Sequence, residues 1–233
     1  MKQLILQTKW QLVLLARNNI IVISFILTVI YAGIFLAIRD LGNMDKVLTL
    51  LILNDPAVIG LFFIGLMVII EKNQKVLEAL FVAPISHHVY LISRILALSI
   101  ICWICAIGMG MAALGTSFHI IHYSAGVLGI SILSCLAGLY MVSYTTEFMP
   151  FTLKSIPVLL FFINIPILNY FEVTNISFFK IFPAQGSLDL IINSYMKTPQ
   201  EAQLIYGYIS TIIWIILLYW FVFRAFKSKI VNV

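Results

Sequence analysis

Residues 71–86 read EKNQKVLEALFVAPIS, a polar, amphipathic stretch between two long apolar segments. In a helical conformation its apolar side chains share one face, at Val76, Leu77, Leu80 and Phe81. Its charged side chains share another face, at Lys72, Lys75 and Glu78. Pro84 then ends the helix before the next apolar run. The pattern predicts a short helix that can transmit force from a soluble partner to membrane-spanning helices; an ordinary interfacial loop is the alternative.

The composition places the chain in a membrane. Of its 233 residues 62% are hydrophobic and 10% are charged, and the mean hydropathy is +1.09. A soluble core of this length cannot bury so much apolar surface, so the bilayer acts as the solvent. Apolar runs long enough to cross it lie near residues 20–38, 51–70, 91–115, 125–146, 155–171 and 205–224. We therefore predict an all-α membrane protein with six transmembrane helices, in a single domain over residues 1–233.

Lysine and arginine residues are divided unevenly between the two sides of the membrane. With the N-terminus in the cytoplasm, the inside segments hold ten: Lys2, Lys9, Arg17, Lys72, Lys75, Arg94, Lys154, Arg224, Lys227 and Lys229. The outside segments hold four: Arg39, Lys46, Lys180 and Lys197. This bias places both termini and residues 71–86 in the cytoplasm. The net charge of +5 suits an anionic inner leaflet, whereas scattered basic residues do not suit nucleic acid.

Residues 1–19 are expected to form an amphipathic helix on the cytoplasmic surface. Apolar side chains share one helical face, at Leu6, Trp10, Val13 and Leu14, opposite Gln7, Thr8 and Gln11. Trp10 suits an anchor at the membrane interface. The polar residues interrupt the apolar run and no small-residue cleavage site follows, which argues against a cleavable signal. The alternative is that this helix extends the first span.

Residues 172–204 form the only sizeable outer segment. Pro183 and Gly186 are expected to break whatever precedes them, and the residues from Ser187 onward can form only a helix too short to cross the bilayer. The segment therefore predicts a re-entrant or interfacial helical hairpin between the fifth and sixth spans.

Asp55 lies within the second apolar run and has two interpretations. An acidic residue in a span can bind a cation or relay protons. Asp55 followed by Pro56 is also the pattern of a helix start, with Asp as the N-cap and Pro in the first turn, and we favour this cap. Glu147, at the cytoplasmic end of the fourth span, is interpreted as an interfacial stop.

The sequence contains no recognisable catalytic, cofactor-binding or metal-binding set. Cys102 and Cys105 are one helical turn apart within a span, where small apolar packing is the expected role. His119 and His122 lack a third ligand of their own. There is no glycine-rich phosphate loop, no His-Glu-x-x-His and no nucleophile elbow. Energy for any work must therefore come from elsewhere.

Several motifs stand close together in residues 54–94. They are Asn54-Asp55-Pro56, the run from Gly60 to Gly65, Glu71-Lys72, Leu77-Glu78-Ala79-Leu80, Val82-Ala83-Pro84-Ile85-Ser86, and Tyr90-Leu91 with Arg94. This set resembles the permease subunits of the ABC-2 type transporter family. In that family a glutamate closes the second span, a short coupling helix follows, and a Pro-Leu/Ile-Ser turn leads to a tyrosine and a basic residue. The Asn-Asp-Pro opening is similar to a branch of small permeases labelled as fluoroquinolone or multidrug exporters.

The resemblance implies a permease subunit of an ATP-driven exporter in the bacterial plasma membrane, which moves a hydrophobic or amphipathic substrate out of the cytoplasm or inner leaflet. It implies two copies of a separate ATPase subunit that binds ATP and Mg, a second permease copy that is identical or related, and surrounding lipids. The residues implied in coupling to the ATPase are Glu71, Lys72, Lys75, Val76, Leu77, Glu78, Leu80, Phe81 and Pro84. The candidates for a substrate path along the second and fifth spans are Phe62, Phe63, Met67, Phe161, Phe162 and Asn164.

Two other functions remain open from the sequence. A haem-export subunit for cytochrome maturation shares the six-span layout and a cytoplasmic coupling segment. A membrane-embedded lipid-modifying enzyme would need polar residues clustered on a membrane face, and the sequence shows no such cluster.

Overall fold

The computed structural model describes residues 2–38, 44–75, 86–115, 117–174, 176–196 and 198–231, which form helices and the turns between them. Within these residues, six helical segments are long and apolar enough to cross a membrane. They are α2 (Ile20–Ile38); α3, η2 and α4 in succession (Met44–Val58, Ile59–Phe63, Ile64–Asn73); α6 (His87–Leu114); α7 (Ile120–Ser143); α8, η3 and α9 (Phe148–Val158, Leu159–Asn164, Ile165–Tyr170); and α11 (Glu201–Phe226) with η5 (Lys227–Val231). The predicted all-α, six-span class is confirmed, although several helices start earlier than the apolar runs indicated.

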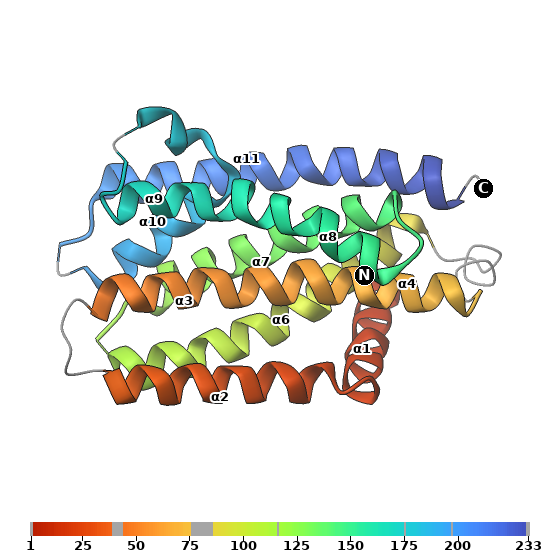
Figure 1. Cartoon of the computed structure of the whole chain (residues 1–233), viewed down its shortest axis with the longest axis horizontal. Coiled ribbons are helices and arrows are strands. Elements are labelled where there is room, and N and C mark those ends of the chain that lie inside the picture. Colours follow the sequence, from red (N-terminus) through yellow and green to blue (C-terminus); the bar gives the residue numbers. More distant parts are fainter. Residues whose placement is uncertain are drawn as a thin grey trace.

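The spanning helices run side by side along the long axis of the molecule, and two shorter helices mark its ends (Figure 1). α1 (Lys2–Arg17) runs across the bundle towards the same end of the long axis at which α4 and the chain's C-terminus lie. α10 (Pro183–Tyr195) lies near the other end. These are called the α1 end and the α10 end below.

The orientation of α1 about its own axis differs from the prediction. Gln11, expected on a solvated face, is buried together with Leu15. Leu6 and Trp10 are 68% and 55% exposed, so the apolar face of α1 points away from the bundle, where lipid can cover it. Asn19 then adopts φ 58°, a left-handed conformation that asparagine tolerates, and the chain turns sharply into α2.

α7 forms the centre of the bundle and is the most buried of the six spans. One cluster of buried side chains joins α7 to α1, α4, α6 and α11. A second cluster joins it to α3, α6, η3 and α10. α2, the α8–α9 segment and α11 bury the smallest share of their residues. Their exposed apolar side chains are compatible with a bilayer, because lipid tails are as apolar as they are.

Glycines bring the second span and α7 into backbone contact. A Cβ atom on Gly138 would lie 2.5 Å from the Leu61 carbonyl oxygen, and one on Gly60 would lie 3.0 Å from the Ser131 carbonyl oxygen. Small residues are typical of such contacts, since helices in a bilayer associate through close van der Waals packing. Side chains larger than hydrogen would separate these two helices.

α10 fits into the bundle by the same means. Its 13 residues are too few to cross a bilayer, yet nearly all of them are buried. A Cβ on Gly126 of α7 would lie 2.8 Å from Ile191 Cγ1, and one on Gly186 would lie 2.8 Å from the Gly207 carbonyl oxygen in α11. α10 is therefore wedged between α7 and α11 over glycine surfaces.

The segment over 172–204 partly follows its expected form. It contains the short 3₁₀ helix η4 (Ser177–Ile181) and then α10. Pro183 occupies the first turn of α10, where its missing N–H costs nothing. Gly186, expected to break the chain, lies inside the helix, because its missing side chain is what allows the approach to α11.

The interpretation of Asp55 as an N-cap is wrong. α3 begins at Met44 and continues through Pro56, so Asp55 lies in the interior of a helix and is 6% exposed. Pro56 has no N–H to offer the preceding turn, and the π-helical segment η2 starts shortly after it, at Ile59. An Asp-Pro pair has the same local pattern at a helix start and inside a membrane helix, where neighbouring helices compensate for the lost hydrogen bond.

The stretch over 71–86 differs from the prediction at its start. α4 continues through Glu71 and Lys72, so both belong to the last turn of the second span. Residues 76–85, the greater part of the predicted coupling helix, lie outside the described residues. α6 begins after Ser86, whose hydroxyl accepts a hydrogen bond from the first turn as an N-cap.

Candidate functional site

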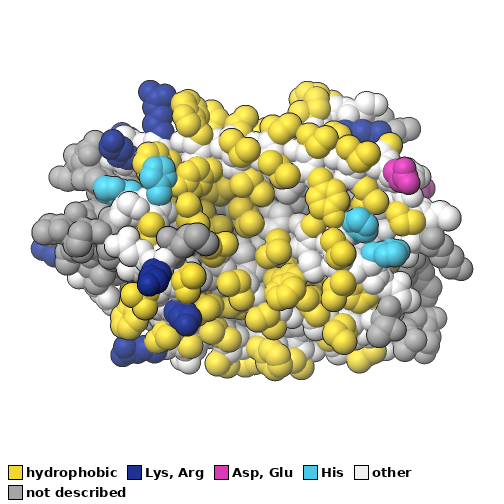
Figure 2. All heavy atoms as spheres, turned by 180° about the vertical axis from the view of Figure 1, so that it is seen from behind, with side chains coloured by type: hydrophobic (Ala, Val, Ile, Leu, Met, Phe, Trp, Pro, Cys, Tyr) yellow, Lys and Arg dark blue, Asp and Glu magenta, His cyan; other side chains and the backbone are white. Residues whose placement is uncertain are grey.

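Basic side chains gather at the α1 end. In Figure 2, lysine and arginine side chains lie mainly near one end, and hydrophobic side chains cover the face between the ends. The basic residues in elements at the α1 end are Lys2, Lys9, Arg17, Lys72, Lys75, Arg94, Lys154, Arg224, Lys227 and Lys229. At the α10 end, the described residues hold Lys46 and Lys180. The fold thus places on one side the segments that the charge bias assigns to the cytoplasm.

A buried ion pair joins the two helices that flank residues 76–85. Glu71, in the last turn of α4, pairs with the Nη2 atom of Arg94 in α6. The Tyr90 hydroxyl donates a hydrogen bond to the other carboxylate oxygen of Glu71, at 2.9 Å. The Arg94 guanidinium also lies over the Tyr90 ring, 4.3 Å from its centroid. Tyr90 and Arg94 are one helical turn apart, so both reach Glu71 from one face of α6.

α1 covers this ion pair from the side. α1 packs against α6, and Gln11 and Leu15 border the same small gap as Met67 and Arg94. Within the described part of the chain, Nε and Nη1 of Arg94 and Oε1 of Gln11 have no hydrogen-bond partner. Buried polar groups gain free energy from pairing, so the contact between α1 and α6 leaves part of this free energy unrealised.

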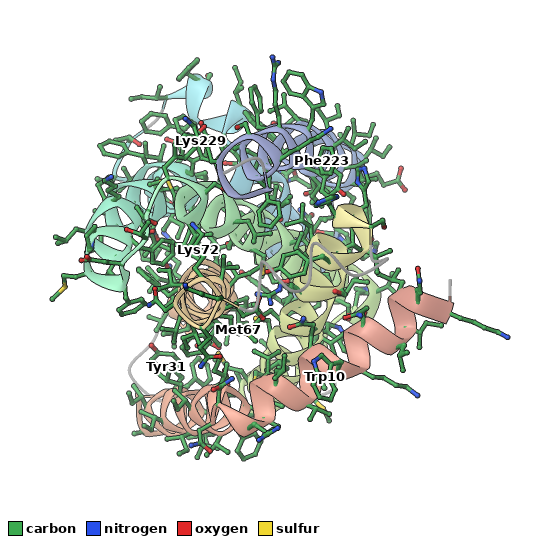
Figure 3. The ribbon with its side chains drawn as sticks, turned by 90° about the vertical axis from the view of Figure 1, so that its right-hand side faces the viewer. Trp10, Tyr31, Met67, Lys72, Phe223 and Lys229 are labelled. Carbon is green, nitrogen blue, oxygen red and sulfur yellow. The ribbon has the colours of Figure 1, made fainter. Side chains whose placement is uncertain are left out.

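Lys72 ties the end of α4 to the end of α7. Its ammonium group donates hydrogen bonds to the carbonyl oxygens of Val142, at 2.8 Å, and Thr145, at 3.0 Å. The last carbonyls of a helix lack partners inside the helix and carry partial negative charge, so a lysine is well suited to this place. Figure 3 looks onto the α1 end and shows Lys72 near the middle of the bundle.

The first turn of α6 is attached to the end of α11. The His88 ring stacks on Phe223, with centroids 4.0 Å apart and planes 9° apart. Its Nδ1 atom is 2.7 Å from the Tyr219 hydroxyl. The ring of Tyr90, two residues later, lies 5.5 Å from that of Phe226. The chain that leaves residues 76–85 therefore contacts α11 at once.

Together these contacts form a mechanical junction at the α1 end. The helices on both sides of residues 76–85 are joined to each other, and through them to α1, α7 and α11. The described residues hold no group of three or more side chains that could bind a metal ion. The arrangement suits transmission of movement.

The nine predicted coupling residues do not share one environment in the structure. Glu71 is buried in the ion pair, Lys72 faces α7, and Lys75 is exposed, with φ 56°. Six others lie outside the described residues: Val76, Leu77, Glu78, Leu80, Phe81 and Pro84. Contact of this set with an ATPase stays a prediction.

Several residues of the junction were not identified from the sequence as part of it. Tyr90 and Arg94 belong to the motifs that carry the family resemblance, so a signal for them existed. Gln11 of α1 and Tyr219 and Phe223 of α11 carry no local signal, because they are distant in sequence from the stretch that they contact.

The candidate path residues fall mainly in irregular segments of the second and fifth spans. Phe62 and Phe63 lie in η2, and Phe161, Phe162 and Asn164 lie in η3; Met67 follows in α4. Each π-helical segment begins shortly after a proline within its span, Pro56 or Pro157. Such segments often occur at functional sites, and the prolines are the signal that could have located them.

The described fold does not gather the path candidates on one surface. Phe62 packs edge-on against Phe151 within the core, with ring centroids 6.3 Å apart. Phe161 is 61% exposed. Phe162 borders an apolar groove of about 340 Å³ that it shares with Trp214 of α11. Their role in a substrate path stays a prediction.

Comparison with known proteins identifies a family. The family model described as the fluoroquinolones export permease protein family matches residues 2–233. No curated protein and no solved structure matches the chain.

Proposed function

Because this chain belongs to the fluoroquinolones export permease protein family, we propose that it is the membrane-spanning subunit of an ATP-driven exporter and takes its energy from a separate ATPase. The observation that carries the proposal is the junction at the α1 end. It joins both helices next to residues 76–85 to each other and to three further helices. A membrane protein that is driven by a soluble ATPase needs such a junction to transmit movement of the ATPase to its spanning helices.

The coupling mechanism follows from these contacts. The amphipathic stretch over 76–85 docks on the ATPase, and a movement of the ATPase displaces it. Glu71 and Arg94 keep the adjoining ends of α4 and α6 together, so both helices move as one. Lys72 passes the movement to α7, and His88 passes it to α11. ATP and Mg are bound by the ATPase, since the sequence has no phosphate-binding loop.

We place the α1 end in the cytoplasm of a bacterium, with the chain in the plasma membrane. The basic residues at that end support this orientation, because lysine and arginine are retained on the cytoplasmic side. α1 then lies at the inner leaflet, with Trp10 and the neighbouring apolar residues in contact with lipid. The α10 end faces outward.

The working assembly contains two permease copies, identical or related, and two ATPase subunits. The substrate is a hydrophobic or amphipathic molecule that passes between the permease copies along the second and fifth spans. The paired irregularities η2 and η3 support this path, because they let two spans deform where a straight α-helix would resist. Membership of an export permease family favours this function over cytochrome maturation or lipid modification.

Co-purification of the ATPase tests the proposal. The tagged chain is expressed in its own host, and the ABC ATPase recovered with it is quantified. Truncation of Leu80 to Ala removes apolar contacts, and it costs about 2–5 kcal/mol of stabilising free energy if the side chain is fully packed. Glu78→Lys introduces a wrongly signed charge into the proposed interface. We expect each variant to insert normally and to recover at least about tenfold less ATPase.

The matched control is Lys197→Glu, a charge reversal in the sequence between α10 and α11, which should leave ATPase recovery unchanged. Wild-type recovery and transport by both Leu80→Ala and Glu78→Lys would show that residues 71–86 are an ordinary loop, and the proposed coupling would be wrong.

A further inference from the structure

The last span carries two adjoining surface features in its half nearer the α1 end, a basic pocket and an apolar groove. The basic pocket has a volume of about 400 Å³ and is lined by Trp220, Phe223, Arg224, Lys227 and Ser228. The apolar groove has a volume of about 340 Å³ and lies between α7, the fifth span and α11. The proposed coupling mechanism assigns a ligand to neither of them.

The polar groups of the basic pocket favour an anion. Arg224 and Lys227 are both exposed, and the described residues that line the pocket include no carboxylate. Neither cation forms an ion pair with another described residue. The Arg224 guanidinium lies over the Trp220 ring, 5.6 Å from its centroid, and this contact holds it at the pocket. A guanidinium and an ammonium group without an opposing acid suit a phosphate group.

The apolar groove has the position and the lining of a site for an acyl chain. Trp214, Leu217 and Phe221 of α11 line one side of it, and Phe162 of η3 and Met141 of α7 line the others. Trp214 lies at the middle of α11 and Phe221 near its end. The helix rises about 10 Å between these two residues, which is most of the roughly 15 Å depth of one leaflet of hydrocarbon. The groove therefore extends from the middle of the bilayer towards the interface on the α1 side.

Two aromatic rings join the pocket to the groove. Trp220 lines the pocket and Phe221 lines the groove, and their ring centroids are 4.9 Å apart. Both side chains are exposed, Trp220 to 56% and Phe221 to 45%, so one ligand can cover both rings. Tryptophan is typical of the membrane interface, where the headgroup of a lipid meets its chains. A free phosphate would use the pocket alone, and an uncharged chain would use the groove alone.

We propose that the basic pocket and the apolar groove together bind one anionic phospholipid. Its phosphate lies against Arg224 and Lys227, and one of its acyl chains lies in the groove beside Phe221. The α1 end, which we place in the cytoplasm, then faces the leaflet whose anionic lipids attract basic residues. Phe223 borders the pocket and also stacks on His88 of the junction, so the lipid contacts α11 where α6 is attached to it. Lipid binding requires neither the ATPase nor a substrate, so the site goes beyond the proposed function and can fail separately from it.

Three probes separate the headgroup from the chains. Dioleoyl phosphatidylglycerol has an anionic headgroup and two long chains. Dioleoyl phosphatidylcholine keeps the chains but has a zwitterionic headgroup, and glycerol phosphate carries the anionic group without chains. Each probe is titrated into the purified full chain in detergent, and the bound molecules are counted by native mass spectrometry. We expect phosphatidylglycerol to bind in preference to phosphatidylcholine, and glycerol phosphate to show no measurable binding.

Two variants test the two parts of the site. Arg224→Gln/Lys227→Gln removes both charges of the pocket, and we expect it to weaken binding of phosphatidylglycerol about tenfold or more. Leu217→Trp fills the groove with a larger side chain and should also weaken binding of phosphatidylglycerol, although the pocket is intact. All three positions are exposed, so the fold should tolerate the changes. The melting temperature of each variant shows that the fold is retained.

The control removes the same charge at the same end of the molecule. Lys2→Gln/Lys9→Gln changes two exposed residues of α1 that do not line the pocket or the groove. Figure 3 looks onto the α1 end and shows Trp10 of α1 on one side of the bundle and Phe223 of α11 on the other. We expect the control to bind phosphatidylglycerol as wild type does.

Four outcomes overturn the proposal. Equal losses in Arg224→Gln/Lys227→Gln and in the control would show a general attraction of the basic end to anionic lipid. Equal binding of the two lipids by wild type would show that the headgroup is not recognised. Unchanged phosphatidylglycerol binding in Leu217→Trp, or comparable binding of glycerol phosphate, would show an anion site without a place for the chain. Disulfide formation between two copies that carry Leu217→Cys, in native membranes, would assign the groove to a second copy of the chain.

Discussion

Glu71 and Arg94 show what a single buried charge pair does in this molecule. Arg94 is 2% exposed, and its pairing with Glu71 takes place among apolar side chains. The desolvation of two charges offsets much of their attraction, so such a pair adds little net stability compared with apolar residues. The effect of the pair is on geometry, because moving the two residues apart would leave each of them as an unpaired buried charge. The pair therefore fixes the relative position of α4 and α6 at the place where we propose that force enters.

Separating the two charges should cost more than removing both. Arg94→Met leaves Glu71 as an uncompensated buried carboxylate, a loss of about 3–5 kcal/mol. We expect the melting temperature in detergent to fall clearly for Arg94→Met and to recover in large part in the double variant Glu71→Gln/Arg94→Met. The control is Lys46→Met, which removes a pair whose partner Glu172 is 83% exposed and should cost less than about 1 kcal/mol. Equal losses for the single and double variants would contradict this account.

Asp189 should make stability depend on pH. Its pKa is raised from 3.8 to about 6 in the folded chain, mainly by burial. Between these two values the folded chain keeps a proton that the unfolded chain has released. This stabilisation is present below pH 3.8 and is lost as pH rises through about 6. We expect Asp189→Asn to melt at a higher temperature than wild type at pH 7.5, with the difference shrinking towards pH 4.5. A difference that does not change with pH would show that Asp189 is not responsible.

The position of α10 depends on small residues. It is too short to span a bilayer, and it stays in place because glycines in three helices let backbones touch. The second and fifth spans show the opposite device, a proline followed by a π-helical segment, which loosens a helix. The structure thus combines tightly packed helices at the α10 end with two spans that can bend. An exporter that opens and closes a path needs both properties.

Filling one glycine contact should displace α10. In Gly186→Val the new Cβ would meet the Gly207 carbonyl oxygen at 2.8 Å, and backbone cannot move aside as a flexible side chain can. Overpacking of this kind costs about 1–3 kcal/mol. We expect a lower melting temperature and faster hydrogen exchange in α10. The control is Gly108→Val in α6, where nothing lies within 4 Å of the place that a Cβ atom would take. If the two variants behave alike, the wedge is not held by glycine contacts.

The whole molecule has two different ends. The α1 end carries most of the basic residues and the junction, and the α10 end carries the wedge and a polar pocket around Asp189. Between them the surface is largely apolar, and Figure 2 shows this band on one face. A bilayer covers such a band, whereas both ends meet water. The division agrees with a motor on one side of the membrane and release of substrate on the other.

Labelling of single cysteines tests this orientation. The native cysteines Cys102, Cys105 and Cys135 are buried, so they give little background. We expect a membrane-impermeant maleimide to label Thr198→Cys in intact cells, and to label Lys75→Cys only after the membrane is opened. Both positions are exposed, so accessibility alone does not separate them. Labelling of Lys75→Cys from outside would reverse the orientation and overturn the proposed coupling to a cytoplasmic ATPase.

The sequence by itself determined the fold class and the number of spans. In a bilayer every backbone polar group must be satisfied within its own segment, so a long apolar run in this chain has to form a helix. That requirement is local, and composition and run length are enough to apply it. The helix over the N-terminal residues was predictable from its amphipathic pattern, and the short helix after Pro183 from a segment too short to span.

Only the tertiary structure decided which side chains meet. Hydropathy cannot tell a helix face that touches lipid from one that touches protein, because both are apolar. Hydropathy therefore could not predict three placements: Gln11 points inward, Glu71 is buried against Arg94, and Asp55 lies inside a continuous helix. The pocket around Asp189 joins η4, α10 and α11, and the approach of α10 to α11 depends on glycine contacts. The chain's local pattern made the helices, and their packing against one another made the sites.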